Sequence, residues 1–230
     1  MVQRSNKIIF LFIFLSLPLL FSGCSGKSAS NTLSKDSLSE DLKELYDAKA
    51  LLNKADGLFK NKDYIGATKE YQRFLELHPL HQSASYAQYR IGLSYFKQIR
   101  SIDRDIEPVQ KALLSFETEL KNYPGNEYAD DVTAKIKTCR EKLAEREFYI
   151  GTFYLKKENY PAAIERFRHI LTDYSDTEVV QKAIYHLGIA YSSSGEPDKA
   201  VEALQNLIDK YPDTSYKKNA TQVLARLNNH

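Results

Sequence analysis

The chain contains 230 residues, of which 32 are lysine or arginine and 30 are aspartate or glutamate. Arg4 and Lys7 are the only charged residues in positions 1–23, so the remaining 207 residues hold 30 basic and 30 acidic side chains. This balance gives no reason to propose nucleic acid as a partner. The chain also lacks a Gly-rich phosphate loop, a G-x-S-x-G turn and an H-E-x-x-H helix, which mark several classes of enzyme. We therefore predict a protein that is not an enzyme, with no cofactor and no metal site.

The N-terminal segment has the pattern of an export signal. Arg4 and Lys7 precede an apolar run over residues 8–20, which closes with the string LFSGC at residues 20–24. A basic start, an apolar stretch of about 7–15 residues and small residues before a cleavage site are typical of a secretory signal. A cysteine directly after that site resembles the lipobox of bacterial lipoproteins. The alternative is an ordinary secretory signal with a chance cysteine.

The lipobox resemblance implies a signal peptide over residues 1–23 and acylation of Cys24. Ser25 follows where inner-membrane lipoproteins usually have aspartate, so the resemblance also implies an anchor in the outer membrane, facing the periplasm. Residues 24–40 are rich in serine, and we predict a flexible tether there. Cys139 is then the one remaining cysteine, so no intramolecular disulfide can form. No later apolar run approaches the ~18 residues of a membrane span, which leaves the lipid as the membrane element.

The rest of the chain shows a repeated spacing. Four alanines are each followed, twelve residues later, by a residue that favours the end of a helix. The pairs are Ala67 and Pro79, Ala112 and Pro124, Ala163 and Ser175, and Ala200 and Pro212. Ala55, Gly151 and Gly188 lie twelve residues before their alanines, whereas Gly92 lies twenty before Ala112. The difference predicts eight inserted residues in the second unit.

This spacing resembles that of tetratricopeptide (TPR) repeats, which are helix–turn–helix units of about 34 residues. We predict an all-α fold, a TPR-type α-solenoid of antiparallel helix pairs over residues 41–228. Its four repeats span about residues 46–80, 84–125, 128–176 and 178–213, and a capping helix covers 214–228. Residues 128–157 contain no helix breaker, which predicts one long helix or two nearly continuous ones.

Local strings resemble one family of TPR lipoproteins. Residues 86–95 (YAQYRIGLSY) and 101–105 (SIDRD) are similar to the third repeat and the Asp-Arg-Asp insertion of the BamD family of the β-barrel assembly (BAM) machinery. The resemblance implies a scaffold that binds a BamA-type barrel protein through its POTRA domain and associates with other BAM lipoproteins. It also implies binding of C-terminal segments of unfolded outer-membrane proteins. Family members usually have two repeats before the insertion, whereas this chain has one, and that departure bears on the role in client recognition.

Three groups of candidate site residues follow. Arg166 lies where the family has an arginine that contacts the POTRA domain, and its alternative role is that of a solvated helix residue. Asp103, Arg104 and Asp105 either stabilise the insertion internally or face a partner. Aromatic side chains on the inner helices suit an extended peptide with aromatic residues, although burial against a neighbouring repeat explains them equally well. The groove candidates are Tyr86, Tyr89, Phe96, Phe148 and Tyr185.

Two other functions remain open from the sequence. A periplasmic TPR lipoprotein can act as an adaptor that coordinates peptidoglycan or cell-division factors. A peptidoglycan-linked role in DNA uptake is a third interpretation. The SIDRD insertion favours the assembly role over both, because generic TPR proteins have no insertion at that point.

Overall fold

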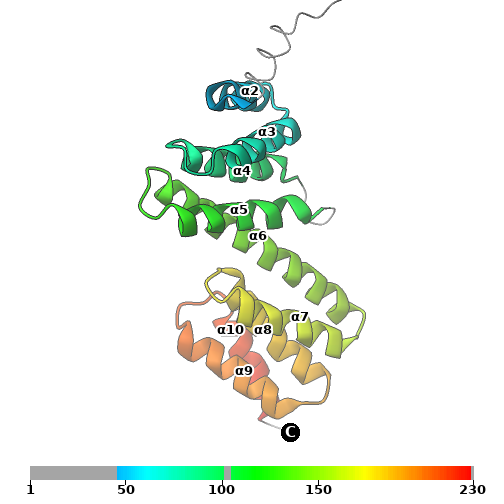
Figure 1. Ribbon diagram of the computed structural model, residues 1–230. Coiled ribbons are helices and arrows are strands. Elements are labelled where there is room, and N and C mark those ends of the chain that lie inside the picture. The colour runs from blue at the N-terminus through cyan, green and yellow to red at the C-terminus, as the bar shows by residue number, and fades with distance from the viewer. Residues whose placement is uncertain (1–45, 101–104, 229–230) are drawn as a thin grey trace, which may run out of the picture.

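The computed structural model describes residues 46–100 and 105–228. Within these ranges the chain forms helices joined by turns, and it contains no strand. The helices are α2 (Ala48–Lys60), α3 (Tyr64–Leu77), α4 (Ala84–Gln98), α5 (Glu107–Asn122), α6 (Ala129–Lys156), α7 (Tyr160–Asp173), α8 (Val179–Ser193), α9 (Pro197–Lys210) and α10 (Lys217–Leu227). They stack as the antiparallel pairs α2–α3, α4–α5, α6–α7 and α8–α9, followed by α10 (Figure 1). The prediction of an all-α, TPR-type solenoid is confirmed.

Short turns within three of the pairs share one backbone geometry. The central residues of the α2–α3, α6–α7 and α8–α9 turns are Lys62, Glu158 and Gly195, with φ of 64°, 57° and 80°. A left-handed conformation reverses the chain within three residues, but it costs a residue with a Cβ atom about 1–2 kcal/mol. Asp63 and Asn159 follow the first two and accept hydrogen bonds from amides in the first turn of α3 and α7. Each side chain thereby satisfies one unpaired helical donor.

The repeat spacing corresponds to a repeated contact between the two helices of a pair. A Cβ atom placed on the glycine of the first helix would lie within 2.6 Å of a large side chain on the second. The contacts are Gly92 with Phe116, Gly151 with Phe167, and Gly188 with Leu204. The partners are 24 residues apart in the first contact and 16 in the other two. The predicted insertion of eight residues is therefore confirmed, and the repeat glycines are required by close helix packing.

Most of this insertion lies between α4 and α5. Eight residues, 99–106, connect these two helices, whereas three residues connect the helices of the other pairs. Asp103 and Arg104 lie outside the described residues. Asp105 is described, and its carboxylate accepts a 3.0 Å hydrogen bond from the amide of Glu107 at the start of α5.

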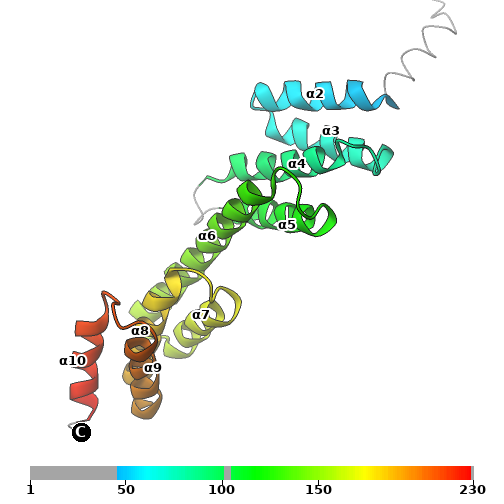
Figure 2. The same ribbon diagram turned by 90° about the vertical axis from the view of Figure 1, so that its left-hand side faces the viewer.

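Helix α6 joins two cores. Its 28 residues form one continuous helix, as the absence of a breaker predicted. Its first half contributes Val132 and Cys139, followed by Leu143 at the midpoint, to a core shared with α5. Its second half contributes Ala144 to a core shared with α7, α8, α9 and α10. In Figures 1 and 2, α6 accordingly crosses from the α2–α5 stack to the α7–α10 stack.

The last helix covers the end of the array. Ala220 and Leu224 of α10 are 0% and 9% exposed and belong to the C-terminal core. Tyr216, just before α10, stacks on Tyr185 with ring centroids 5.0 Å apart. The capping helix is thus present, as a repeat array requires at its end. Within residues 46–100 and 105–228, no helix is both long and apolar enough to cross a bilayer.

Candidate functional site

The inner helices α2 and α4 present a cluster of polar and aromatic side chains around Asp56. Tyr86 donates a 2.7 Å hydrogen bond to Oδ1 of Asp56, and the buried Tyr71 donates to the same oxygen. Arg90 donates from Nε to the Tyr71 hydroxyl at 2.9 Å, and its guanidinium lies 3.7 Å from the ring centroid of Phe59. Burial first, and then the bond to Asp56, raise the pKa of both tyrosines. The Tyr86 hydroxyl therefore stays protonated, and it donates its hydrogen bond to Asp56 of α2.

Tyr89 lies beside this cluster and contacts the start of α6. Its ring stacks on that of Tyr128 at 4.5 Å, with an interplanar angle of 8°. Its hydroxyl donates a 2.8 Å hydrogen bond to Asp131, which also accepts from Lys135 at 3.0 Å. Burial of the ring and this bond raise the pKa of Tyr89. Tyr89 and Tyr128 together form a half-buried aromatic surface between α4 and α6.

The remaining groove candidates also contact neighbouring elements. Phe96 lies 6.2 Å from Phe116, and the ammonium of Lys135 lies 5.4 Å from its ring centroid. Phe148 lies 4.9 Å from His186. Tyr185 contacts His186 as well and stacks on Tyr216. All of these aromatic residues are half-buried.

The groove candidates therefore form two surfaces rather than one stripe. Tyr86, Tyr89 and Phe96 lie on α4 between α2 and the start of α6. Phe148 and Tyr185 lie with the C-terminal core. Asp131 and Phe148 are 17 residues apart on α6, which is roughly 25 Å at the rise of an α-helix. Every candidate has an intramolecular partner, as the alternative interpretation supposed, and peptide binding by their exposed parts remains a prediction.

Arg166 forms an ion pair between α7 and α6. Its Nη1 lies 3.1 Å from Oε2 of Glu147, whose side chain is 13% exposed, whereas 41% of the Arg166 side chain is exposed. The hydrogen bond to Glu147 raises the pKa of Arg166. Nδ1 of His169 lies 3.6 Å from the same carboxylate oxygen. Arg166 also lines a pocket of about 710 Å³, together with Ile164, Tyr191 and Lys199. The guanidinium is thus oriented by Glu147 and still accessible.

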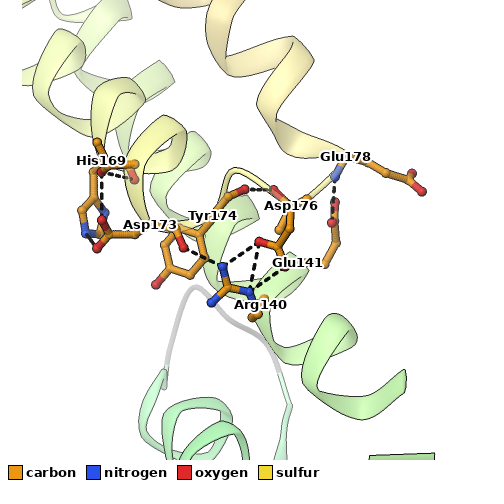
Figure 3. A network of polar contacts seen from close by, with 9 residues as sticks. Arg140, Glu141, His169, Asp173, Tyr174, Asp176 and Glu178 are labelled. Carbon is orange, nitrogen blue, oxygen red and sulfur yellow. Dashed lines mark hydrogen bonds and ion pairs between the residues drawn. The ribbon is translucent and has the colours of Figure 1, made fainter. Parts of the chain in front are cut away.

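A polar clamp between α6 and the α7–α8 turn was not predicted from the sequence. Arg140 donates to both carboxylate oxygens of Asp176, from Nε at 2.9 Å and from Nη2 at 2.6 Å, and to the carbonyl of Asp173 at 2.7 Å. Glu141 accepts a 3.0 Å hydrogen bond from the Glu178 amide at the start of α8. Figure 3 shows both residues of α6 facing this turn. The bonds to Arg140 lower the pKa of Asp176. The only signal in the sequence was the dense charge of residues 135–147.

Of the two cysteines, only Cys139 lies among the residues that the structure describes. Cys24 lies outside the described residues, so its acylation remains a prediction. Cys139 is completely buried in α6, and burial raises the pKa of its thiol to about 12. A thiol that stays protonated and inaccessible cannot act as a nucleophile. The described cysteine therefore has a packing role.

The stacked hairpins, their register and their capping helix define this chain as a TPR-type repeat protein. Residues 42–203 match the model of the YfiO family, which is described as an outer membrane lipoprotein. The match covers more than half of the chain, and the chain belongs to this family.

Curated relatives carry a more specific name. "Outer membrane protein assembly factor BamD" of Rickettsia prowazekii is 32% identical over 180 residues, which is 78% of this chain and 72% of the relative. The protein of the same name from Vibrio cholerae is 31% identical, over 67% of this chain and 68% of the relative. That of Caulobacter vibrioides is 33% identical, over 62% of this chain but 47% of the relative. This chain therefore matches only part of the length of these relatives.

Proposed function

We propose that this protein is a non-enzymatic assembly factor for outer-membrane proteins. It acts as a lipid-anchored TPR scaffold on the periplasmic face of the outer membrane. It holds a BamA-type barrel protein through the POTRA domain of that protein, and it associates with other lipoproteins of the same machinery. The observation that carries the proposal is the family match over residues 42–203, which include both aromatic surfaces and Arg166.

Arg166 supports the contact with the barrel protein. A guanidinium held by a carboxylate of its own chain loses less conformational entropy when it binds a second carboxylate. Glu147 supplies that support, because its side chain is mostly buried and its oxygen lies 3.1 Å from Arg166. A partner carboxylate would then reach Arg166 at the adjoining pocket on α7.

The Tyr86–Tyr89 surface supports binding of client segments. Half-buried aromatic rings give affinity for extended peptides with aromatic side chains. Arg90, which lies beside them, is already paired with Asp56. Alanine at both tyrosines is expected to weaken binding of a peptide that ends in an aromatic residue. Titration of the purified protein with such a peptide measures the effect, and an unchanged affinity would reject this part of the proposal.

Co-purification from solubilised membranes tests the scaffold role. We expect the tagged wild-type chain to recover a BamA-type barrel protein, and we expect Arg166→Glu to reduce that recovery. Arg226→Glu is the control, because Arg226 is exposed on α10, has no ion pair among the described residues and does not line the pocket beside Arg166. Recovery of peptidoglycan enzymes without a barrel protein would instead indicate an adaptor.

Replacement of Cys24 by serine tests the anchor separately. The variant is expected to lose its membrane association, because acyl chains that each bury many methylene groups are the proposed attachment. Fractionation of cells into soluble and membrane material measures this change. If the serine variant stayed in the outer membrane to the same extent, the lipid anchor would be rejected while the scaffold role would stand.

A further inference from the structure

The second half of α6 lacks a neighbour that the other inner helices have. Helix α4 packs against both α3 and α5, and α8 packs against both α7 and α9. Helix α6 also contacts α5 and α7, but it contacts them with different halves of its length. The second half therefore has α7 and α8 beside it and no preceding helix on its other side. Figures 1 and 2 both show α6 running on beyond the α2–α5 stack.

The side chains on that open side differ from those of α4 and α8. Two residues after the repeat glycine, α4 and α8 have Ser94 and Ala190, which are both 0% exposed, whereas α6 has Phe153, which is 50% exposed. Five residues before the glycine, α4 and α8 have buried alanines, and α6 has Arg146. Small residues on α4 and α8 admit the preceding helix at close range. Bulky residues on α6 would exclude a helix packed in that way.

These bulky residues form one continuous face. Lys142, Arg146, Tyr149, Phe153 and Lys156 follow one another at intervals of three or four residues on α6, which places them on one side of the helix. We name this set the α6 stripe. Tyr149 is 63% exposed, so the two aromatic rings of the stripe are the largest exposed apolar groups of α6.

The charge of the α6 stripe is positive. It contains three cationic side chains. Glu145 shares this side of the helix, and Glu141 and Glu178 line the same hollow as Lys142 at one end of the stripe. Among the described residues, none of the three cations takes part in an ion pair. Tyr149 and Phe153 are exposed, although Phe153 also contacts Tyr154, and Arg146 is half-buried. Tyrosine and arginine are among the residues that most often dominate protein interfaces.

We propose that the α6 stripe is a docking surface for a protein segment that presents apolar side chains flanked by carboxylates. The rings of Tyr149 and Phe153 bury the apolar groups, and Arg146 with Lys142 or Lys156 pairs with the carboxylates. A bilayer is a poorer fit, because a helix that lies on a membrane needs a long apolar face, and this face has two aromatic residues. The inference rests on the scaffold role proposed above and adds a second contact surface, on a different side of α6 from Glu147.

Site-specific photocrosslinking in the native cells tests this inference. A benzophenone amino acid replaces Tyr149 or Phe153 in the full-length, tagged chain, and mass spectrometry identifies the crosslinked peptide. We expect a protein peptide in which acidic residues flank apolar ones. The same amino acid at Leu114 is the control, because that side chain of α5 is also exposed, at 65%, and lies outside the α6 stripe.

Charge variants make the test specific. Lys142→Glu with Arg146→Glu is expected to lower the crosslinking yield about tenfold, as the loss of two partly exposed charge contacts implies. Lys142→Arg with Arg146→Lys keeps both charges and is expected to keep the yield. Crosslinks to lipid, equal yields at Leu114, no crosslink at all, or a yield that charge reversal leaves unchanged would each overturn the inference.

The outcome is separable from that of the proposed function. If a barrel protein co-purifies with the wild-type chain but the α6 stripe gives no charge-dependent crosslink, the docking surface is wrong and the scaffold role stands. If the stripe crosslinks to an acidic segment while no barrel protein is recovered, the docking surface stands and the proposed assembly role fails.

Discussion

The hairpins α6–α7 and α8–α9 follow one another in the chain and use the same internal contacts in different surroundings. In both, a glycine of the first helix accommodates a large side chain of the second, namely Phe167 against Gly151 and Leu204 against Gly188. Both turns also contain a residue with positive φ. Yet α8 lies between two helices along its length, whereas the second half of α6 has one open side. The residues that pack the two helices of a hairpin together are therefore different from those that decide whether a further helix packs beside it.

What differs between the hairpins is the way each is held to the preceding repeat. Helix α8 buries small side chains such as Ala183 and Ala190 against its neighbours. Helix α6 packs on α5 only near its start, through residues such as Val132 and Cys139, and its Arg140 pairs with Asp176 in the turn that follows α7. We expect substitutions to show this difference in the free energy of unfolding.

The largest effect is expected where the two hairpins are alike. Phe167→Ala and Leu204→Ala each leave a cavity at a site that is 0% exposed. The first is expected to lower the free energy of unfolding by about 3–5 kcal/mol and the second by about 2–5 kcal/mol. Urea unfolding followed by far-ultraviolet circular dichroism measures both. A loss below about 1 kcal/mol for either would contradict the shared register, because surface substitutions lie in that range.

A smaller effect is expected where the hairpins differ. Ala190→Phe gives α8 the residue that α6 has at the equivalent position, and it overfills a site that is 0% exposed. We expect a loss of about 1–3 kcal/mol. The reciprocal change Phe153→Ala should alter the free energy of unfolding by no more than about 0.5 kcal/mol, since the phenylalanine is half exposed. Equal effects of the two changes would mean that α6 is packed on both sides.

The Arg140 clamp is expected to contribute less than either core site. Arg140→Ala removes a bidentate ion pair whose aspartate side chain is 54% exposed, so screening limits the loss to about 1 kcal/mol. Arg140→Lys is the control, because it keeps the charge but cannot donate in the bidentate geometry. An intermediate stability is expected for it.

The clamp also predicts a pH dependence. Because Arg140 lowers the pKa of Asp176 in the folded protein, this contribution is present above the unfolded carboxyl pKa of about 3.9. It is lost as the pH falls through the lower folded value, when Asp176 becomes protonated. The wild type and Arg140→Ala should therefore converge in stability below about pH 4. A difference of the same size at pH 2 would show that the clamp acts through the bond to the Asp173 carbonyl or through packing, and not through Asp176.

The smallest effect is expected at the turns. Glu158 has φ of 57° where Gly195 has φ of 80°. Glu158→Gly relieves the left-handed strain and is expected to stabilise the protein by about 0.5 kcal/mol, after the added freedom of the unfolded chain is subtracted. Gly195→Ala introduces the same strain and should destabilise by a similar amount. Thermal unfolding of the two variants compares them directly, and shifts of the same sign would reject the common turn geometry.

Much of the fold could be predicted from single positions and their spacing. The glycine at position 151 and the alanine at position 163 recur at 188 and 200. Close packing between paired helices leaves room for a small residue only, which is glycine at these sites and Ala55 in α2. The absence of a breaker over residues 128–157 predicted one long helix or two nearly continuous ones, and α6 is a single helix. These features are local, because each depends on contacts within one hairpin or on the backbone itself.

The candidate surfaces could be predicted only in part. The aromatic residues of α4 were found from their helical spacing, but the bonds of Tyr71 and Tyr86 to Asp56 connect residues 15 and 30 positions apart. The stacking of Tyr89 on Tyr128 joins α4 to the segment before α6. Periodicity identifies the face of a helix on which a residue lies. It does not identify the side chain that lies opposite.

By itself, the sequence determined the repeat register and the place of the eight-residue insertion, because these depend on side-chain size and on spacing along the chain. Only the tertiary structure decided which faces of those helices are covered. It paired Arg166 with Glu147 across two helices, it set Arg140 against Asp176, and it left Tyr149 and Phe153 exposed. The physical reason is that the burial of a side chain depends on where the neighbouring helices lie. The packing of α5 against the first half of α6 depends on contacts between residues far apart in the sequence.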